Sequence, residues 1–124
     1  MPGCRVLIVE DEFITAMDLE AIVESFGHRV VGPVKSPDEA IELAGNETAD
    51  IALLDVALGT ERALPVADEL DRLGIPYALV TAYDSESLGP RFKNALYVSK
   101  PFRTADIEAA IKSLRAAALH HASN

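Results

Sequence analysis

Three short, uninterrupted apolar runs constrain the fold of this chain more than any other feature of its sequence. They are Val6–Val9, Ile51–Leu54 and Tyr77–Val80. Because apolar residues in these runs are continuous and do not alternate with polar ones, both faces of each predicted strand should be covered. The segments between the runs are long enough for helices, which is typical of βαβ units with right-handed crossovers.

Strands and helical segments alternate along the whole chain. The strands are predicted at residues 4–10, 29–34, 50–55, 76–81 and 95–99. The helices are predicted at residues 13–26, 37–44, 63–73, 85–93 and 104–119. This order predicts an α/β fold, namely a flavodoxin-like, doubly wound, five-stranded parallel sheet in the order 2-1-3-4-5 with helices on both faces. Residues 1–119 should form one domain, and residues 120–124 a frayed tail.

Local signals support two of these helices and weaken a third. In the first, Phe13, Met17 and Ala21 recur near helical spacing together with residues 23–26. The second begins at a capping-box pattern, with Ser36 followed three residues later by Glu39. Gly89 and Pro90 interrupt the fourth, so we expect that helix to be short or irregular.

Composition excludes several classes of protein. The chain has 124 residues and a formal net charge of −9, which disfavours direct binding to nucleic acid and favours a basic or cationic partner. Its one cysteine, Cys4, rules out an internal disulfide and fits a reducing compartment. No stretch resembles a signal peptide or reaches the ~20 apolar residues of a membrane span. We therefore expect a cytoplasmic protein with no membrane contact.

Acidic residues follow two strands that should be neighbours at the switch point of the sheet. Glu10 and Asp11 follow the first strand, and Asp55 ends the third. Three carboxylates in one crevice repel one another unless a cation compensates them, and oxygen ligands suit Mg²⁺ or Mn²⁺. We expect Asp11 and Asp55 to be direct ligands and Glu10 a direct or water-mediated one. The backbone carbonyl of Ala57 would complete the set.

The other strand ends supply groups suited to phosphoryl transfer. Thr81 follows the fourth strand and Lys100 the fifth, so a hydroxyl and an ammonium group could each bind a phosphoryl oxygen. Asp55 could act as the nucleophile and form an acyl phosphate. Each residue alone is more typical of a helix cap, a turn or a solvated loop. Their joint arrangement favours a functional site.

These positions also carry a family resemblance. Glu10-Asp11, Asp55, Thr81 and Lys100-Pro101-Phe102, in this order, resemble the receiver domain of two-component response regulators over residues 4–119. The segment 79–83 resembles the Phe-Ala-Thr-Gly-Tyr signature of a subfamily of stand-alone receivers, which suggests a single-domain regulator. A truncated piece of a longer regulator would look the same.

The resemblance implies a role for each matched position. By this resemblance, Glu10 and Asp11 correspond to the acidic pair that binds the metal, and Asp55 corresponds to the phosphorylation site. Lys100 corresponds to the lysine of the receiver pattern. It also implies a cis peptide bond between Lys100 and Pro101. Thr81 and Tyr97 become a switch pair, in which Thr81 moves toward the phosphoryl group and Tyr97 fills the space that it leaves.

We therefore expect a phosphoacceptor of two-component signalling. A sensor histidine kinase or histidine phosphotransfer protein would donate the phosphoryl group, and a downstream protein would bind the face formed by residues 85–93, 95–99 and the last helix. The chain would be a monomer or a phosphorylation-dependent dimer. It would catalyse its own phosphorylation and dephosphorylation, and would not act as a conventional turnover enzyme.

Two departures from the receiver pattern leave alternatives open. Gly59 stands where receivers usually have proline, and Ala82 replaces the glycine of the signature. The first alternative is a Mg²⁺-dependent phosphohydrolase with an aspartyl nucleophile, although such enzymes commonly place a second aspartate at the position of Ala57. The second is a degenerate receiver that serves as a phosphorylation-independent interaction module.

Overall fold

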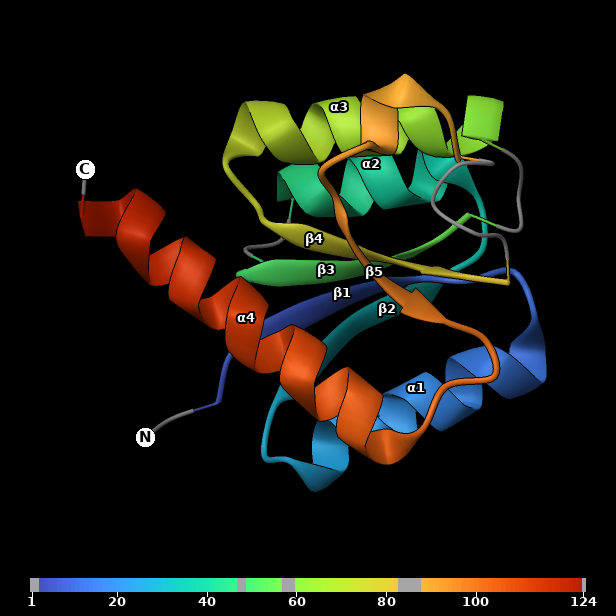
Figure 1. Cartoon of the computed structure of the whole chain (residues 1–124), viewed down its shortest axis with the longest axis vertical. Coiled ribbons are helices and arrows are strands. Elements are labelled where there is room, and N and C mark those ends of the chain that lie inside the picture. The colour runs from blue at the N-terminus through green and yellow to red at the C-terminus, as the bar shows by residue number, and fades with distance from the viewer. Residues whose placement is uncertain (1–2, 47–48, 57–59, 83–87, 124) are drawn as a thin grey trace.

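A single five-stranded parallel sheet forms the centre of the computed structural model, which describes residues 3–46, 49–56, 60–82 and 88–123. Its strands lie in the order β2-β1-β3-β4-β5, and every neighbouring pair is parallel (Figure 1). This order confirms the predicted flavodoxin-like topology. The strands are β1 (Arg5–Val9), β2 (Arg29–Val34), β3 (Ile51–Asp55), β4 (Tyr77–Thr81) and β5 (Leu96–Ser99).

Helices cover both faces of the sheet (Figure 1). They are α1 (Phe13–Ser25), α2 (Pro37–Asn46), α3 (Thr60–Leu73), the 3₁₀ helix η2 (Pro90–Phe92) and α4 (Thr104–Ser123). Ser36 caps α2 in accordance with the predicted pattern, because its hydroxyl accepts a hydrogen bond from the Glu39 backbone N–H at 3.2 Å. Gly74 follows α3 at a φ of 73°, a conformation that glycine adopts without steric cost.

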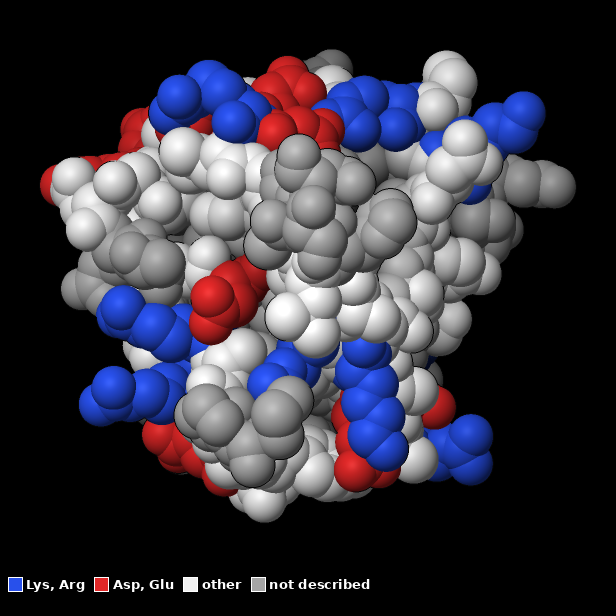
Figure 2. Space-filling view, turned by 90° about the vertical axis from the view of Figure 1, so that its left-hand side faces the viewer, with Lys and Arg blue, Asp and Glu red and all other residues white. Residues whose placement is uncertain are grey.

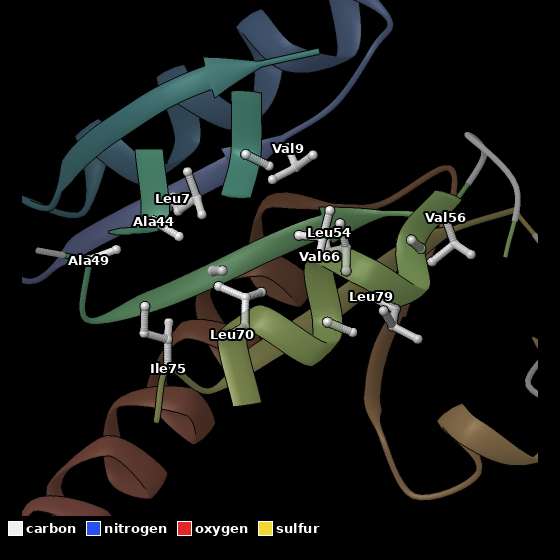
Figure 3. Close-up of a cluster of buried hydrophobic side chains, with 14 of the residues drawn as sticks. Leu7, Val9, Ala44, Ala49, Leu54, Val56, Val66, Leu70, Ile75 and Leu79 are labelled. Atoms are coloured by element: carbon white, nitrogen blue, oxygen red, sulfur yellow. The ribbon is translucent and has the colours of Figure 1, made fainter. Parts of the chain in front are cut away.

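Two apolar cores lie on opposite faces of the sheet. One contains side chains of β1, β3 and β4 that pack against α2, α3 and the η2 segment, and Figure 3 shows Leu54, Val66 and Leu70 within it. The other joins the opposite sides of the same strands to α1 and α4. Because β1, β3 and β4 contribute to both cores, their apolar runs are continuous, as their sequences predicted.

The structure corrects the predicted apolar stripe of the first helix. Phe13 is 75% exposed and Met17 is 53% exposed, whereas Ala16, Leu19 and Val23 are the buried residues of α1. The helix carries apolar residues on more than one face, so spacing alone did not identify the one that packs on the sheet.

The segment from β4 to the C-terminus also differs in part from the helices predicted for it. Between β4 and β5, the described residues include the 3₁₀ helix η2, and residues 85–87 of the short or irregular helix predicted there lie outside the described residues. The last helix continues to Ser123, beyond the predicted end at Leu119. Alanine-rich sequence follows Arg115 without glycine or proline to stop the helix.

The surface carries both signs of charge. On the face shown in Figure 2, Lys and Arg side chains are intermixed with Asp and Glu, so the net charge of −9 does not make this face uniformly acidic. Within the described residues, no helix combines the length and the apolar character needed to cross a membrane.

Candidate functional site

The predicted site residues lie at the carboxyl ends of four strands. Glu10 follows β1, Asp55 ends β3 and Thr81 ends β4, and all three side chains are almost fully buried. Lys100 follows β5, and its backbone N–H donates a hydrogen bond to the Thr81 carbonyl at 2.8 Å. The parallel sheet therefore brings residues separated by up to 90 positions in sequence to one edge.

The Lys100 ammonium group links the first and third strands. Its Nζ lies 3.0 Å from Glu10 Oε1 and 3.2 Å from Asp55 Oδ1. Glu12 Oε1 is a third carboxylate oxygen nearby, at 3.9 Å from Nζ. The Lys100–Pro101 peptide bond is cis, as the resemblance implied.

Three acidic side chains form a group that could hold a metal ion. One carboxylate oxygen each from Glu10, Asp11 and Asp55 lie within 4.8 Å of one another. Glu10 and Asp55 are buried and Asp11 is exposed, so the group opens to solvent on one side. An all-carboxylate donor set with room for water fits Mg²⁺ or Mn²⁺. Ala57, the predicted source of a carbonyl ligand, lies outside the described residues.

Burial and crowding change the protonation of Glu10. Desolvation and the neighbouring Asp55 raise the pKa of Glu10 from its ordinary value of 4.5 to about 8, although Lys100 opposes this shift. Desolvation lowers the pKa of Lys100, but its hydrogen bond to Glu10 and the charge of Asp55 outweigh that effect and raise it overall. The ammonium is therefore charged at neutral pH, and the acid group is short of positive charge.

The proposed switch residues occupy neighbouring strands. Thr81 on β4 is fully buried, whereas Tyr97 on β5 is 39% exposed. Thr81 pairs in register with Ser99, and Tyr97 pairs with Leu79. The two residues thus belong to adjacent strands and lie two residue pairs apart.

Two features of the site were missed in the sequence. Glu12 received no role, although it adjoins Glu10 and Asp11 and its backbone N–H donates to Glu10 Oε2 at 3.2 Å. The acidic run itself was the available signal. The second feature is an apolar patch on α1 formed by Phe13, Ile14 and Met17, all exposed. It borders a cavity of about 320 Å³ that Glu10 and Asp11 also line.

Known proteins are similar to this chain in sequence and structure. The chain is 38% identical over 114 residues to the phyllosphere-induced regulator PhyR of Methylorubrum extorquens, covering 86% of this chain and 42% of PhyR. It is 33% identical over 112 residues to the transcriptional regulatory protein PdtaR of Mycobacterium tuberculosis, covering 87% of this chain and 55% of PdtaR. The crystal structure of the response regulator PhyR from Brucella abortus matches with a TM-score of 0.82 at 33% identity, covering 98% of this chain and 50% of that chain. The chain thus spans about half the length of these relatives.

The family described as "Response regulator receiver domain" matches residues 6–112. This segment contains Glu10, Asp55, Thr81 and Lys100, which meet at one edge of the sheet. It also contains the five-stranded order 2-1-3-4-5 almost in full. Sequence, topology and the grouping of acidic and basic side chains agree, and the chain therefore belongs to the family of response regulator receiver domains.

Proposed function

We propose that the chain is a phosphoacceptor of two-component signalling and that Asp55 receives a phosphoryl group from a phosphohistidine. The donor would be a sensor histidine kinase or a histidine phosphotransfer protein. The observation that carries this proposal is the buried Asp55 carboxylate, with the Lys100 ammonium 3.2 Å from its Oδ1 and two further acids within metal-binding distance.

The reaction needs an oxygen nucleophile and positive charge around the transferred group. A carboxylate oxygen of Asp55 would bond to phosphorus as the donor's N–P bond breaks, with the electron pair left on the imidazole nitrogen. Water would later attack the acyl phosphate, breaking its O–P bond to release inorganic phosphate and return the free carboxylate.

Lys100 and Thr81 would act on the phosphoryl oxygens. The Lys100 ammonium would exchange one carboxylate partner for a phosphoryl oxygen, and the Thr81 hydroxyl would donate to another. Glu10, Asp11 and Asp55 would hold Mg²⁺ or Mn²⁺. When bound, this ion supplies positive charge that the acid group and the phosphoryl oxygens share.

Two surface features support the proposal that the chain binds protein partners. The exposed patch of Phe13, Ile14 and Met17 borders the site and would contact the phosphodonor. A groove of about 310 Å³ lies between β5 and α4, and it is lined in part by Tyr97. A downstream protein, or a second phosphorylated copy, would bind there, next to the residue proposed to switch.

Phosphorylation can be tested by intact-protein mass spectrometry. In Mg²⁺ with acetyl phosphate, the wild type should gain one phosphoryl group, and Asp55→Asn should gain none because its amide is not a nucleophile. Asp18→Asn, which removes an exposed acid from α1, should behave as the wild type.

The same experiment separates the alternatives. Sustained release of phosphate from phosphomonoesters, without a protein adduct, would identify a phosphohydrolase. A wild-type protein that forms no adduct and does not respond to beryllofluoride would be a degenerate receiver, and the proposal would be wrong.

A further inference from the structure

Lys100 and a divalent cation would compete for the same carboxylates. Two of the three acids around the ammonium, Glu10 at 3.0 Å and Asp55 at 3.2 Å, also belong to the group that could hold a metal. A dication bound to their oxygens would repel the ammonium and weaken both of its short contacts. Another negative charge close to Lys100 would compensate the ammonium for the contacts that it loses, and would favour the presence of both cations together.

Glu12 is placed to supply that charge. Its Oε1 lies 3.9 Å from Lys100 Nζ, and the metal group identified among the described residues does not include it. The Thr15 hydroxyl donates a hydrogen bond to the same Oε1 at 3.1 Å, so the carboxylate is oriented by the first turn of α1. The backbone N–H of Glu12 donates a hydrogen bond to Glu10 Oε2, so the two acidic residues are linked directly.

The Glu12 side chain can also move without a large cost. It is 66% exposed, whereas Lys100 is 14% exposed, so any burial that a shift toward the ammonium brings places the carboxylate beside a group of opposite charge. Glu12 forms no side-chain cap on α1, and its carboxylate is therefore not required to begin the helix.

We propose that Glu12 is a positioning residue that holds and neutralises the Lys100 ammonium while a divalent cation occupies Glu10, Asp11 and Asp55. The inference rests on the proposed function, because it assumes that this acid group binds a metal. Glu12 contacts neither the metal nor the phosphoryl group. It makes the affinity of the acid group for a dication depend on a carboxylate outside that group.

The Mg²⁺ dissociation constant, measured from backbone amide NMR shifts at fixed pH and ionic strength, tests this role. Glu12→Gln should raise it about 3- to 10-fold, since it removes one charge near the site at an intermediate effective dielectric constant. Glu12→Asp keeps the charge but shortens its reach, and Thr15→Val keeps the charge but removes its orienting hydrogen bond. Each of these two variants should raise the Mg²⁺ dissociation constant by about 2- to 3-fold, because each changes the position of the Glu12 charge without removing it.

Glu24→Gln is the matched control. It removes an exposed glutamate from the far end of α1 and should leave the constant unchanged. The proposal is wrong if Glu12→Gln behaves as Glu24→Gln. It is also wrong if Glu12→Asp and Thr15→Val both bind Mg²⁺ as the wild type does, because the charge would then act without regard to its position.

The result also separates this inference from the proposed function. A wild-type protein that does not bind Mg²⁺ contradicts the metal site itself. A wild-type protein that binds Mg²⁺ while all the variants remain unchanged contradicts only the role of Glu12.

Discussion

At the scale of single residues, the site is a balance between buried acids and one ammonium group. Glu10 and Asp55 are each 1% exposed, and Lys100 lies between them. Burial of two carboxylates beside one lysine leaves an excess of negative charge in a region of low dielectric constant. A proton on Glu10 or a bound cation can neutralise part of that excess, so the proton and the cation compete for the site.

The raised pKa of Glu10 predicts how metal-free stability depends on pH. Between its ordinary pKa of 4.5 and about 8, the folded protein keeps a proton that the unfolded chain releases. Stability should therefore fall as pH rises through this range, by on the order of 1–3 kcal/mol. Urea unfolding in the presence of a chelator measures this slope.

Glu10→Gln provides the control for this prediction, because glutamine keeps the size of the side chain but does not titrate. Its stability should change little over the same pH range. A wild-type stability that is constant or rises between about pH 5 and about pH 8 would contradict the shift.

At the scale of elements, side chains of the described residues 88–95 attach the crossover from β4 to β5 to the rest of the fold. Leu88 and Phe92 are buried in the core on the α2–α3 side. Arg91 Nη2 contacts Asp68 at 3.1 Å and Asp71 at 2.5 Å, both on α3. Figure 1 shows η2 lying over α3. The crossover is thus attached to α3, and β5 remains the outer strand of the sheet.

Arg91→Ala should lower the free energy of unfolding by about 1 kcal/mol, since the side chain is 36% exposed and solvent screens its two ion pairs. Arg103→Ala is a suitable control because Arg103 is 85% exposed and its ion pair among the described residues is a local one, with Asp106 in the first turn of α4. Urea midpoints at low and high salt measure both. Equal losses for the two variants would show that the Arg91 contacts do not hold the crossover.

At the scale of the whole molecule, the group of three carboxylates that could hold a metal exists only when the sheet is folded. The acids lie at the carboxyl ends of β1 and β3, which are neighbouring inner strands of the sheet, so a ligand at these ends binds only when the sheet is formed. Glu10 and Asp11 reach the site from one βα unit and Asp55 from another. Metal binding should therefore stabilise the entire domain.

Mg²⁺ at ~100 times its dissociation constant should add about 2.7 kcal/mol to the free energy of unfolding. Differential scanning calorimetry with and without the ion measures the gain as a higher melting temperature. Asp11→Asn should lose most of this gain, because it removes one of the three carboxylates that would hold the ion. The variant should still fold, because Asp11 is exposed and lies outside the buried core. An equal gain in wild type and variant would place the ion elsewhere.

The sequence alone determined the strands, their order and the strand-end residues of the site. It could do so because continuous apolar runs identify strands buried on both faces, and parallel strands must gather their carboxyl ends at one edge. Only the tertiary structure decided which α1 face is buried and that Glu12 approaches Lys100. Both depend on how a helix is rotated against the sheet, and residue spacing does not specify that rotation when apolar side chains occur on more than one face, as with Phe13 and Leu19.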